Sequence, residues 1–186
     1  KYLKRAYDNG QDVEARANML RAAYCAGVAF TQSYVGYVHG IAHSLGGQYG
    51  VPHGLANAVI LPYFLEEYGE SCHERLGKLA KICKIADNND SDSTASEKFI
   101  HWIKEMNESM NIPKHIDGIK EKDIAVMAMH ADKESNPLYP VPKLMDVEEL
   151  KKMYYVVAGE TLETNMERAG FDYGNQQISR KTERVF

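Results

Sequence analysis

Apolar residues recur every three or four positions along most of the chain, which is the spacing that places them on one face of an α-helix. The spacing predicts a long helix over about 12–45, a helix that starts near Pro52 and runs through Phe64, another over about 70–85, and three more after the polar stretch 87–93. No run alternates between apolar and polar residues as a half-buried strand does. The pattern therefore predicts an all-α fold.

The first long helix is expected to be buried, because apolar and small residues lie on most of its sides. These residues are Ala15, Met19, Leu20, Ala23, Ala26, Phe30 and Tyr34. Gly36 and Gly40 each weaken a helix by about 1 kcal/mol, so a break is expected near Ser33–Gly36. The glycines of 46–54 predict a loop, and Pro52 is suited to the first turn of the next helix.

Two capping patterns predict where helices begin in the second half of the chain. Thr94 and Glu97 have the spacing of a capping box, in which each side chain bonds the other residue's backbone N–H. Asp146 and Glu149 repeat this spacing. We therefore expect one helix to open at Thr94 and the last helix to open at Asp146.

Between those two helices the pattern predicts a short helix that begins near Lys122 and ends at about Ala131. The prolines of 136–142 then fix an extended segment, because the residue before a proline avoids the helical region. Apolar periodicity fades after Gly159. We expect a helical domain over 1–159 and a polar tail of unassigned role over 160–186.

Composition and charge narrow the class of protein. A chain of 186 residues that is 44% hydrophobic and 26% charged is typical of a globular protein with a sizeable core. The net charge of -4 provides no basic surface for nucleic acid. The longest apolar stretch, 58–65, is far short of the roughly 20 residues of a membrane helix. Three cysteines without a C-x-x-C pair favour a reducing, cytoplasmic compartment over a disulfide framework. They are Cys25, Cys72 and Cys83.

Three of the seven histidines lie close together in the sequence and form a candidate metal site. His39 and His43 are four residues apart, so a helix places both rings on one face with their Cβ atoms roughly 5–6 Å apart. His53 follows a glycine-rich loop that can fold back to that face. Imidazole binds Zn, Fe, Ni or Cu, and a site without cysteine favours a catalytic role. A histidine pair at this spacing also occurs on ordinary surfaces and in cores, so spacing alone leaves both interpretations open.

The remaining histidines stand among charged or loop residues, and we expect them to face solvent. They are His73, His101, His115 and His130.

Two motifs in the first half of the chain combine glycine and histidine at fixed spacing. They are Gly36-x-x-His39-x-x-x-His43-x-x-Gly46 and Pro52-His53-Gly54-x-Ala56-Asn57. Together they resemble the signature of the iron-containing (group III) alcohol dehydrogenases, and the resemblance extends over about 1–159. Members of that family have an N-terminal α/β domain that binds NAD(P) and an all-helical C-terminal domain that supplies metal ligands. The resemblance implies that this chain is the helical domain. Its start at Lys1 without a methionine also leads us to expect a longer parent polypeptide.

The resemblance, rather than the spacing, implies a role for each site residue. Family members hold iron(II), or zinc in some cases, with one aspartate and three histidines. His39 and His53 match two of these ligands, and the aspartate and the remaining histidine are expected before Lys1. His43 matches a pocket residue near the substrate and the nicotinamide, where it is suited to proton relay. Phe30 matches an aromatic position that lines the pocket.

The function implied by the resemblance is NAD(P)-linked interconversion of primary alcohols or diols with aldehydes. The run Asp132-Lys133-Glu134-Ser135 departs from the less charged, often cysteine-bearing stretch of better-known members, so the substrate stays open. We expect a homo-oligomer, and we expect the fragment alone to bind metal weakly and to be inactive. The alternative is a stand-alone helical module that binds a divalent metal or a partner protein without catalysis.

Overall fold

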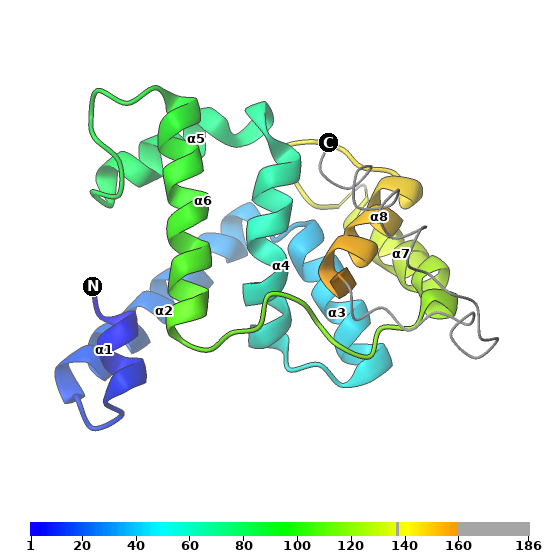
Figure 1. The fold of residues 1–186 in the computed structure, drawn as a ribbon, viewed down its shortest axis with the longest axis horizontal. Helices are drawn as coiled ribbons and strands as arrows, with labels where there is room; N and C mark the ends of the chain where they lie inside the picture. Colours follow the sequence, from blue (N-terminus) through cyan, green and yellow to red (C-terminus); the bar gives the residue numbers. More distant parts are fainter. Residues whose placement is uncertain (137, 160–186) are drawn as a thin grey trace, which may run out of the picture.

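The computed structural model describes residues 1–136 and 138–159, and this part of the chain folds into eight α-helices without a β-strand (Figure 1). The helices are α1 (Leu3–Asp8), α2 (Val13–Ser33), α3 (Tyr37–Tyr49), α4 (His53–Tyr68), α5 (Glu70–Ile82), α6 (Asp92–Ser109), α7 (Glu121–Ser135) and α8 (Val147–Ala158). The predicted all-α class is confirmed. The predicted polar tail over 160–186 lies outside the described residues.

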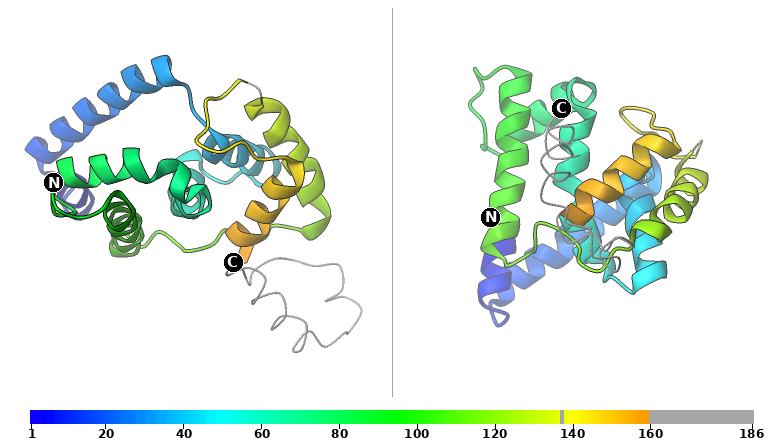
Figure 2. Two further views of the ribbon diagram at one scale, coloured as in Figure 1. Left: turned by 90° about the horizontal axis from the view of Figure 1, so that it is seen from above. Right: turned by 45° about the vertical axis from the view of Figure 1, so that its right-hand side comes forward.

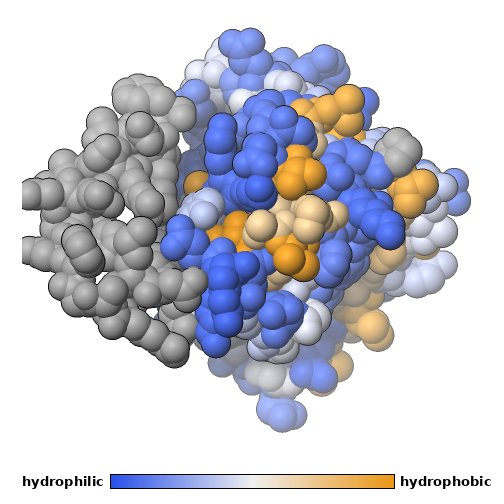
Figure 3. Space-filling model, turned by 90° about the vertical axis from the view of Figure 1, so that its right-hand side faces the viewer, coloured by the Kyte–Doolittle hydropathy of each residue, from blue (hydrophilic) through white to orange (hydrophobic). Residues whose placement is uncertain are grey.

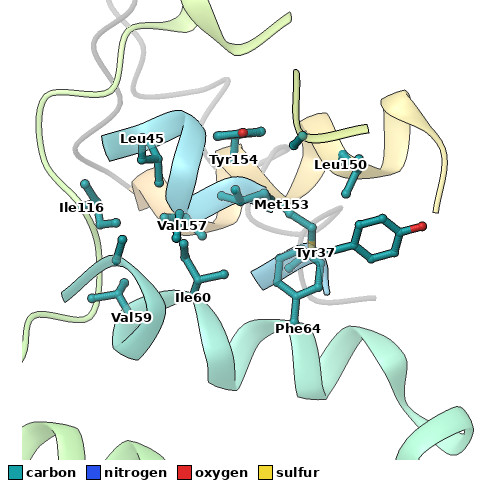
Figure 4. Packing of buried hydrophobic residues seen from close by; sticks show 14 of the residues in the cluster. Tyr37, Leu45, Val59, Ile60, Phe64, Ile116, Leu150, Met153, Tyr154 and Val157 are labelled. Carbon is teal, nitrogen blue, oxygen red and sulfur yellow. The ribbon is translucent and has the colours of Figure 1, made fainter. Parts of the chain in front are cut away.

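The core lies where α3, α4, α7 and α8 meet. Tyr37, Ile41 and Leu45 follow one face of α3 at intervals of four residues, and all three are fully buried. Figure 4 shows side chains of α3, α4 and α8 pointing toward one another, with Phe64 beneath the ring of Tyr37. The two rings stack with their centroids 6.2 Å apart. α4 is apolar on most sides because it contacts helices on several of them, including α3, α6 and α8.

The expected burial of the first long helix is wrong for the described residues. Among the residues of α2 only Ala15 is buried, whereas Leu20 and Tyr24 are 75% and 73% exposed. Figure 2 shows α2 running along the edge of the molecule, away from the core, and its main packing partner is α1. The apolar pattern predicts the helix but not its surroundings, because burial also requires other elements that cover it.

The helix break before the histidines is confirmed, since α2 ends at Ser33 and α3 begins at Tyr37. The loop predicted over 46–54 is largely wrong, because α3 continues to Tyr49. Gly50 then adopts the left-handed conformation, with φ 68°, and its N–H bonds the carbonyl of Gly46. This glycine cap ends α3, so only a short turn separates it from α4.

The capping box of Asp146 and Glu149 is confirmed, with both side chains bonded to the other residue's backbone N–H. The one predicted at Thr94 is wrong. α6 begins three residues earlier, because the hydroxyl of Ser91 accepts the N–H of Thr94 and caps the helix there. The helix expected to end at about Ala131 is also longer, since α7 reaches Ser135.

The side of the molecule on which α7 and α8 lie is mainly hydrophilic, with scattered apolar residues (Figure 3). None of the helices in the described ranges is long and apolar enough to cross a membrane. Among the described residues, α2 carries several large exposed apolar side chains: Leu20, Tyr24, Val28 and Phe30.

Candidate metal centre

The structure brings three imidazole rings together at the junction of α3 and α4. His39 and His43 lie on consecutive turns of α3, and His53 is the first residue of α4. The ring centroid of His53 is 5.3 Å from that of His39 and 5.3 Å from that of His43. The centroids of His39 and His43 are 5.9 Å apart. The tight turn at Gly50 folds the start of α4 back onto the histidine face of α3.

The environment of His39 favours its neutral form. Burial lowers the pKa of this imidazole, because it disfavours the charged ring, and the neighbouring rings of His53 and His43 lower it further. The negative charge of Glu134 raises the pKa of His39, but this effect is smaller than the lowering caused by burial. A neutral imidazole is the form that binds a metal ion.

Asn57 supports His53 from one turn further along α4. Its Nδ2 donates to the backbone carbonyl of His53 at 2.9 Å and lies 3.1 Å from the ring Nε2. Its Oδ1 is buried and has no hydrogen-bond partner in the part of the chain that the structure describes. Sequence analysis did not single out Asn57 as a site residue, although its i, i+4 spacing from His53 was a usable signal.

His43 has a carboxylate partner that sequence analysis missed. Its Nδ1 lies 2.7 Å from Oε1 of Glu134 on α7, and the hydroxyl of Tyr139 donates to the same oxygen at 3.0 Å. The side chains of His43 and Glu134 are 43% and 33% exposed. The pair joins residues 91 positions apart in sequence, so no local pattern marks it.

A hollow of about 490 Å³ opens beside this pair, between α3 and α7. His43 and Glu134 line it together with Asp123 and His130. A larger hollow of about 640 Å³ lies between α4 and α6, and none of the three clustered histidines lines it. Both hollows carry titratable side chains, and the smaller one is distinguished by containing a member of the histidine cluster, His43.

The three clustered imidazoles, His39, His43 and His53, are donor groups of a kind that Zn, Fe, Ni and Cu accept. Within 1–136 and 138–159, no group of three or more His, Cys, Asp or Glu side chains is arranged to hold a metal ion. The three cysteines are free. The donors that meet at the α3–α4 junction are therefore imidazoles without a cysteine.

The other predicted positions have mixed outcomes. Phe30 lies on α2 and is 51% exposed, and no ring contact joins it to the three histidines in the described part of the chain. Its pocket role stays a prediction.

Among the other histidines, His101 and His130 are exposed and His73 is half-buried. The expected solvent exposure is wrong for His115, which stacks on Tyr63 and bonds the carbonyl of Val156 at 3.2 Å.

Comparison with known proteins identifies relatives that share this region. A sequence model described as "Fe-containing alcohol dehydrogenase family, C-terminal" matches residues 1–157. Alcohol dehydrogenase 4 of Schizosaccharomyces pombe is 39% identical over 146 residues, which is 75% of this chain and 34% of that protein. The 1,3-propanediol dehydrogenase of Citrobacter freundii is 39% identical over 138 residues, which is 72% of this chain and 35% of that protein.

Solved structures agree with the sequence relatives. A 1,3-propanediol oxidoreductase superposes with a TM-score of 0.77 at 34% identity, over 82% of this chain and 40% of the other. An alcohol dehydrogenase from Oenococcus oeni gives a TM-score of 0.77 at 35% identity, over 84% of this chain and 41% of the other. The chain spans about a third of the length of the curated relatives it matches. It belongs to the iron-containing alcohol dehydrogenase family and corresponds to the helical C-terminal domain of those enzymes.

Proposed function

We propose that this chain supplies the metal-binding domain of an NAD(P)-dependent enzyme that interconverts small primary alcohols or diols with aldehydes. The observation that carries the proposal is the convergence of His39, His43 and His53 at the α3–α4 junction of a member of this family. Relatives are named as alcohol, 1,3-propanediol, methanol and butanol dehydrogenases, which supports a small alcohol or aldehyde as substrate.

His39 and His53 would hold the metal, iron(II) or zinc, together with ligands from outside this chain. Such an ion would supply Lewis acidity toward an alcohol oxygen, and NAD or NADP would supply the hydride acceptor. Relatives are named for each of these two nicotinamide cofactors. The coenzyme would be bound by parts of the enzyme outside the helical domain.

His43 would move the proton of the reaction. Its Nδ1 is engaged by Glu134, its Nε2 is not, and 43% of its side chain is exposed. It would accept the proton of the substrate hydroxyl and pass it to solvent, and the reverse transfer would protonate the alkoxide formed from an aldehyde. Phe30 would line the pocket, a role that rests on the resemblance of its position.

The exposed apolar side chains of α2 support association of this domain with another protein surface. Leu20, Tyr24 and Val28 are 75%, 73% and 52% exposed on this helix, and apolar surface of this kind marks a contact surface. We propose that the parent enzyme is at least a dimer. The cytoplasmic location inferred from the cysteines stays a prediction.

The test is an assay of the full-length enzyme that contains this domain. The enzyme is loaded with Fe²⁺ or Zn²⁺ and supplied with NAD⁺ or NADP⁺ and a series from ethanol to 1,3-propanediol. We expect turnover that is lost on chelation and restored by the metal, while the 186-residue chain alone shows none. A metal-loaded enzyme that oxidises no alcohol and reduces no aldehyde would contradict the proposal and favour a non-catalytic binding module.

A further inference from the structure

We propose that Glu134, itself held by Tyr139, is a positioning residue for His43. It accepts the Nδ1–H of the imidazole, so the neutral ring carries its proton on Nδ1 and presents Nε2 to the substrate. The catalytic consequence rests on the proposed function, whereas the hydrogen bond and the tautomer do not.

The hydrogen-bonding capacity of Glu134, His43 and Tyr139 fixes which of them donates. Oε1 of Glu134 lies 2.7 Å from Nδ1 of His43 and 3.0 Å from the hydroxyl oxygen of Tyr139. An ionised carboxylate only accepts hydrogen bonds, so both neighbours must donate to it. Burial and the bond to Glu134 raise the pKa of Tyr139, which keeps its hydroxyl protonated and able to donate. This network assigns the proton of a neutral His43 to Nδ1.

Close packing of α3 on α7 brings the two side chains together. Gly40 lies between the two histidines of α3, and a Cβ at this position would collide with Oγ of Ser135 and come within 3.4 Å of the carbonyl of Ala131. The missing side chain therefore lets α7 approach until Glu134, the neighbour of Ser135, reaches His43. The glycine that weakens α3 locally is the residue that permits this contact.

The segment after α7 supplies the third member of the network. The N–H of Tyr139 bonds the carbonyl of Ser135 at 2.8 Å, which turns the chain back toward the end of α7. Asn136, which follows Ser135, accepts a hydrogen bond from the buried hydroxyl of Tyr37 at 2.7 Å. The bond from Tyr37 thus ties the end of α7 to buried α3, and the turn at Tyr139 brings a second donor to the carboxylate of Glu134.

The contact between His43 and Glu134 orients the imidazole more than it stabilises the fold. Its side chains are 43% and 33% exposed, and an ion pair at this exposure adds little to the free energy of folding. The ring that Glu134 fixes lies against the candidate ligand His53, with an interplanar angle of 19°. Fixing His43 therefore fixes the geometry between a proton-carrying ring and a proposed metal ligand.

The first test is the tautomer of His43 in the full 186-residue chain, measured by NMR with ¹⁵N-labelled histidine. Replacement of His43 by Asn assigns its signals. We expect the Nδ1-protonated form to dominate in the wild type. Glu134→Ala should reverse the ratio toward the Nε2-protonated form, which free imidazole side chains prefer. Glu134→Gln keeps an acceptor and should retain the wild-type tautomer.

A matched control is Glu66→Ala, which removes another exposed, ion-paired glutamate, the partner of Lys104. It should leave His43 unchanged. A wild-type His43 protonated on Nε2 overturns the proposal without any variant of Glu134. An unchanged tautomer in Glu134→Ala overturns it as well.

The second test is steady-state kinetics of the full-length enzyme. Glu134→Ala should lower kcat by about ten-fold or more, while KM for the alcohol changes by less than about two-fold and Glu134→Gln recovers most of the loss. A changed tautomer with unchanged kcat would overturn the catalytic consequence. A wild-type enzyme without alcohol turnover would refute the proposed function, and the NMR result would still decide the positioning.

Discussion

The hydroxyl of Tyr37 joins α3 to the segment that follows α7, and Tyr37→Phe removes it alone. Tyr37 is fully buried, donates to Oδ1 of Asn136 at 2.7 Å and accepts the N–H of Met145 at 3.0 Å. Phenylalanine keeps the ring and its stacking on Phe64. The hydroxyl also lies 3.3 Å from the carbonyl of Met145, so the substitution tests all the hydrogen bonds of this group without opening a large cavity.

The expected loss follows from the groups left behind. Asn136 retains hydrogen bonds through its Nδ2, but the N–H of Met145 becomes a buried donor without its partner. An unsatisfied buried group costs about 1–3 kcal/mol, and the loss of the second bond adds to that cost. We expect the free energy of unfolding to fall by about 2–3 kcal/mol.

Urea unfolding followed by far-UV circular dichroism measures this change, with an unchanged m-value as the sign that the compactness of both states is preserved. Tyr24→Phe is the matched control, because Tyr24 is 73% exposed on α2, and its effect should stay within about 0.5 kcal/mol. A Tyr37→Phe effect as small as that of the control would refute the reasoning, since the segment would then be held by other contacts.

Three further predictions concern packing, capping and association. Gly77→Ala would place a Cβ 2.9 Å from Cα and from the carbonyl oxygen of Asp92, so α5 and α6 would have to move apart. We expect the free energy of unfolding to fall by about 1–3 kcal/mol in thermal melting. A melting curve like that of the wild type would contradict this prediction. Asp146→Ala removes the capping box of α8 and should cost about 1 kcal/mol in urea unfolding, whereas Glu148→Ala, in the same turn, should cost much less. Replacing Leu20 and Tyr24 together by serine should weaken self-association of the chain in analytical ultracentrifugation, and an unchanged distribution of species would show that α2 is not the contact surface.

The helices themselves were predictable because their signals are local. The break before Tyr37 follows from weak helix formers, and the start of α8 follows from a capping box that the structure contains. The start of α6 was not predictable in the same way. Ser91 and Thr94 both satisfy the local capping rule, and the earlier residue is the one that caps the helix.

Features that depend on distant neighbours were missed. The apolar pattern of α2 predicts a helix correctly, but its exposure depends on which elements cover it. The contact between His43 and Glu134 depends on how closely α3 approaches α7, and that distance is set by Gly40. The local pattern marks this glycine only as a weak helix former, because its packing partners, Ser135 and Ala131, lie on another helix.

The convergence of the three histidines was predictable only in part. The i, i+4 spacing of His39 and His43 placed two rings together, as the structure shows. The position of His53 depended on a turn whose length was overestimated, yet the shorter turn at Gly50 still folds it onto the other two rings. The assignment of His39 and His53 as ligands follows from the family resemblance, since the ring distances are similar for all three histidines.

The central claim, that His39 and His53 are metal ligands, is tested most directly by the metal content of the full-length enzyme and its His53→Ala variant. Elemental analysis of the purified proteins should show a steep loss of iron or zinc in the variant, with unchanged helicity by circular dichroism. His130→Ala, which alters an exposed histidine at the neighbouring hollow, should keep the wild-type stoichiometry. Full metal occupancy in His53→Ala would contradict the ligand assignment.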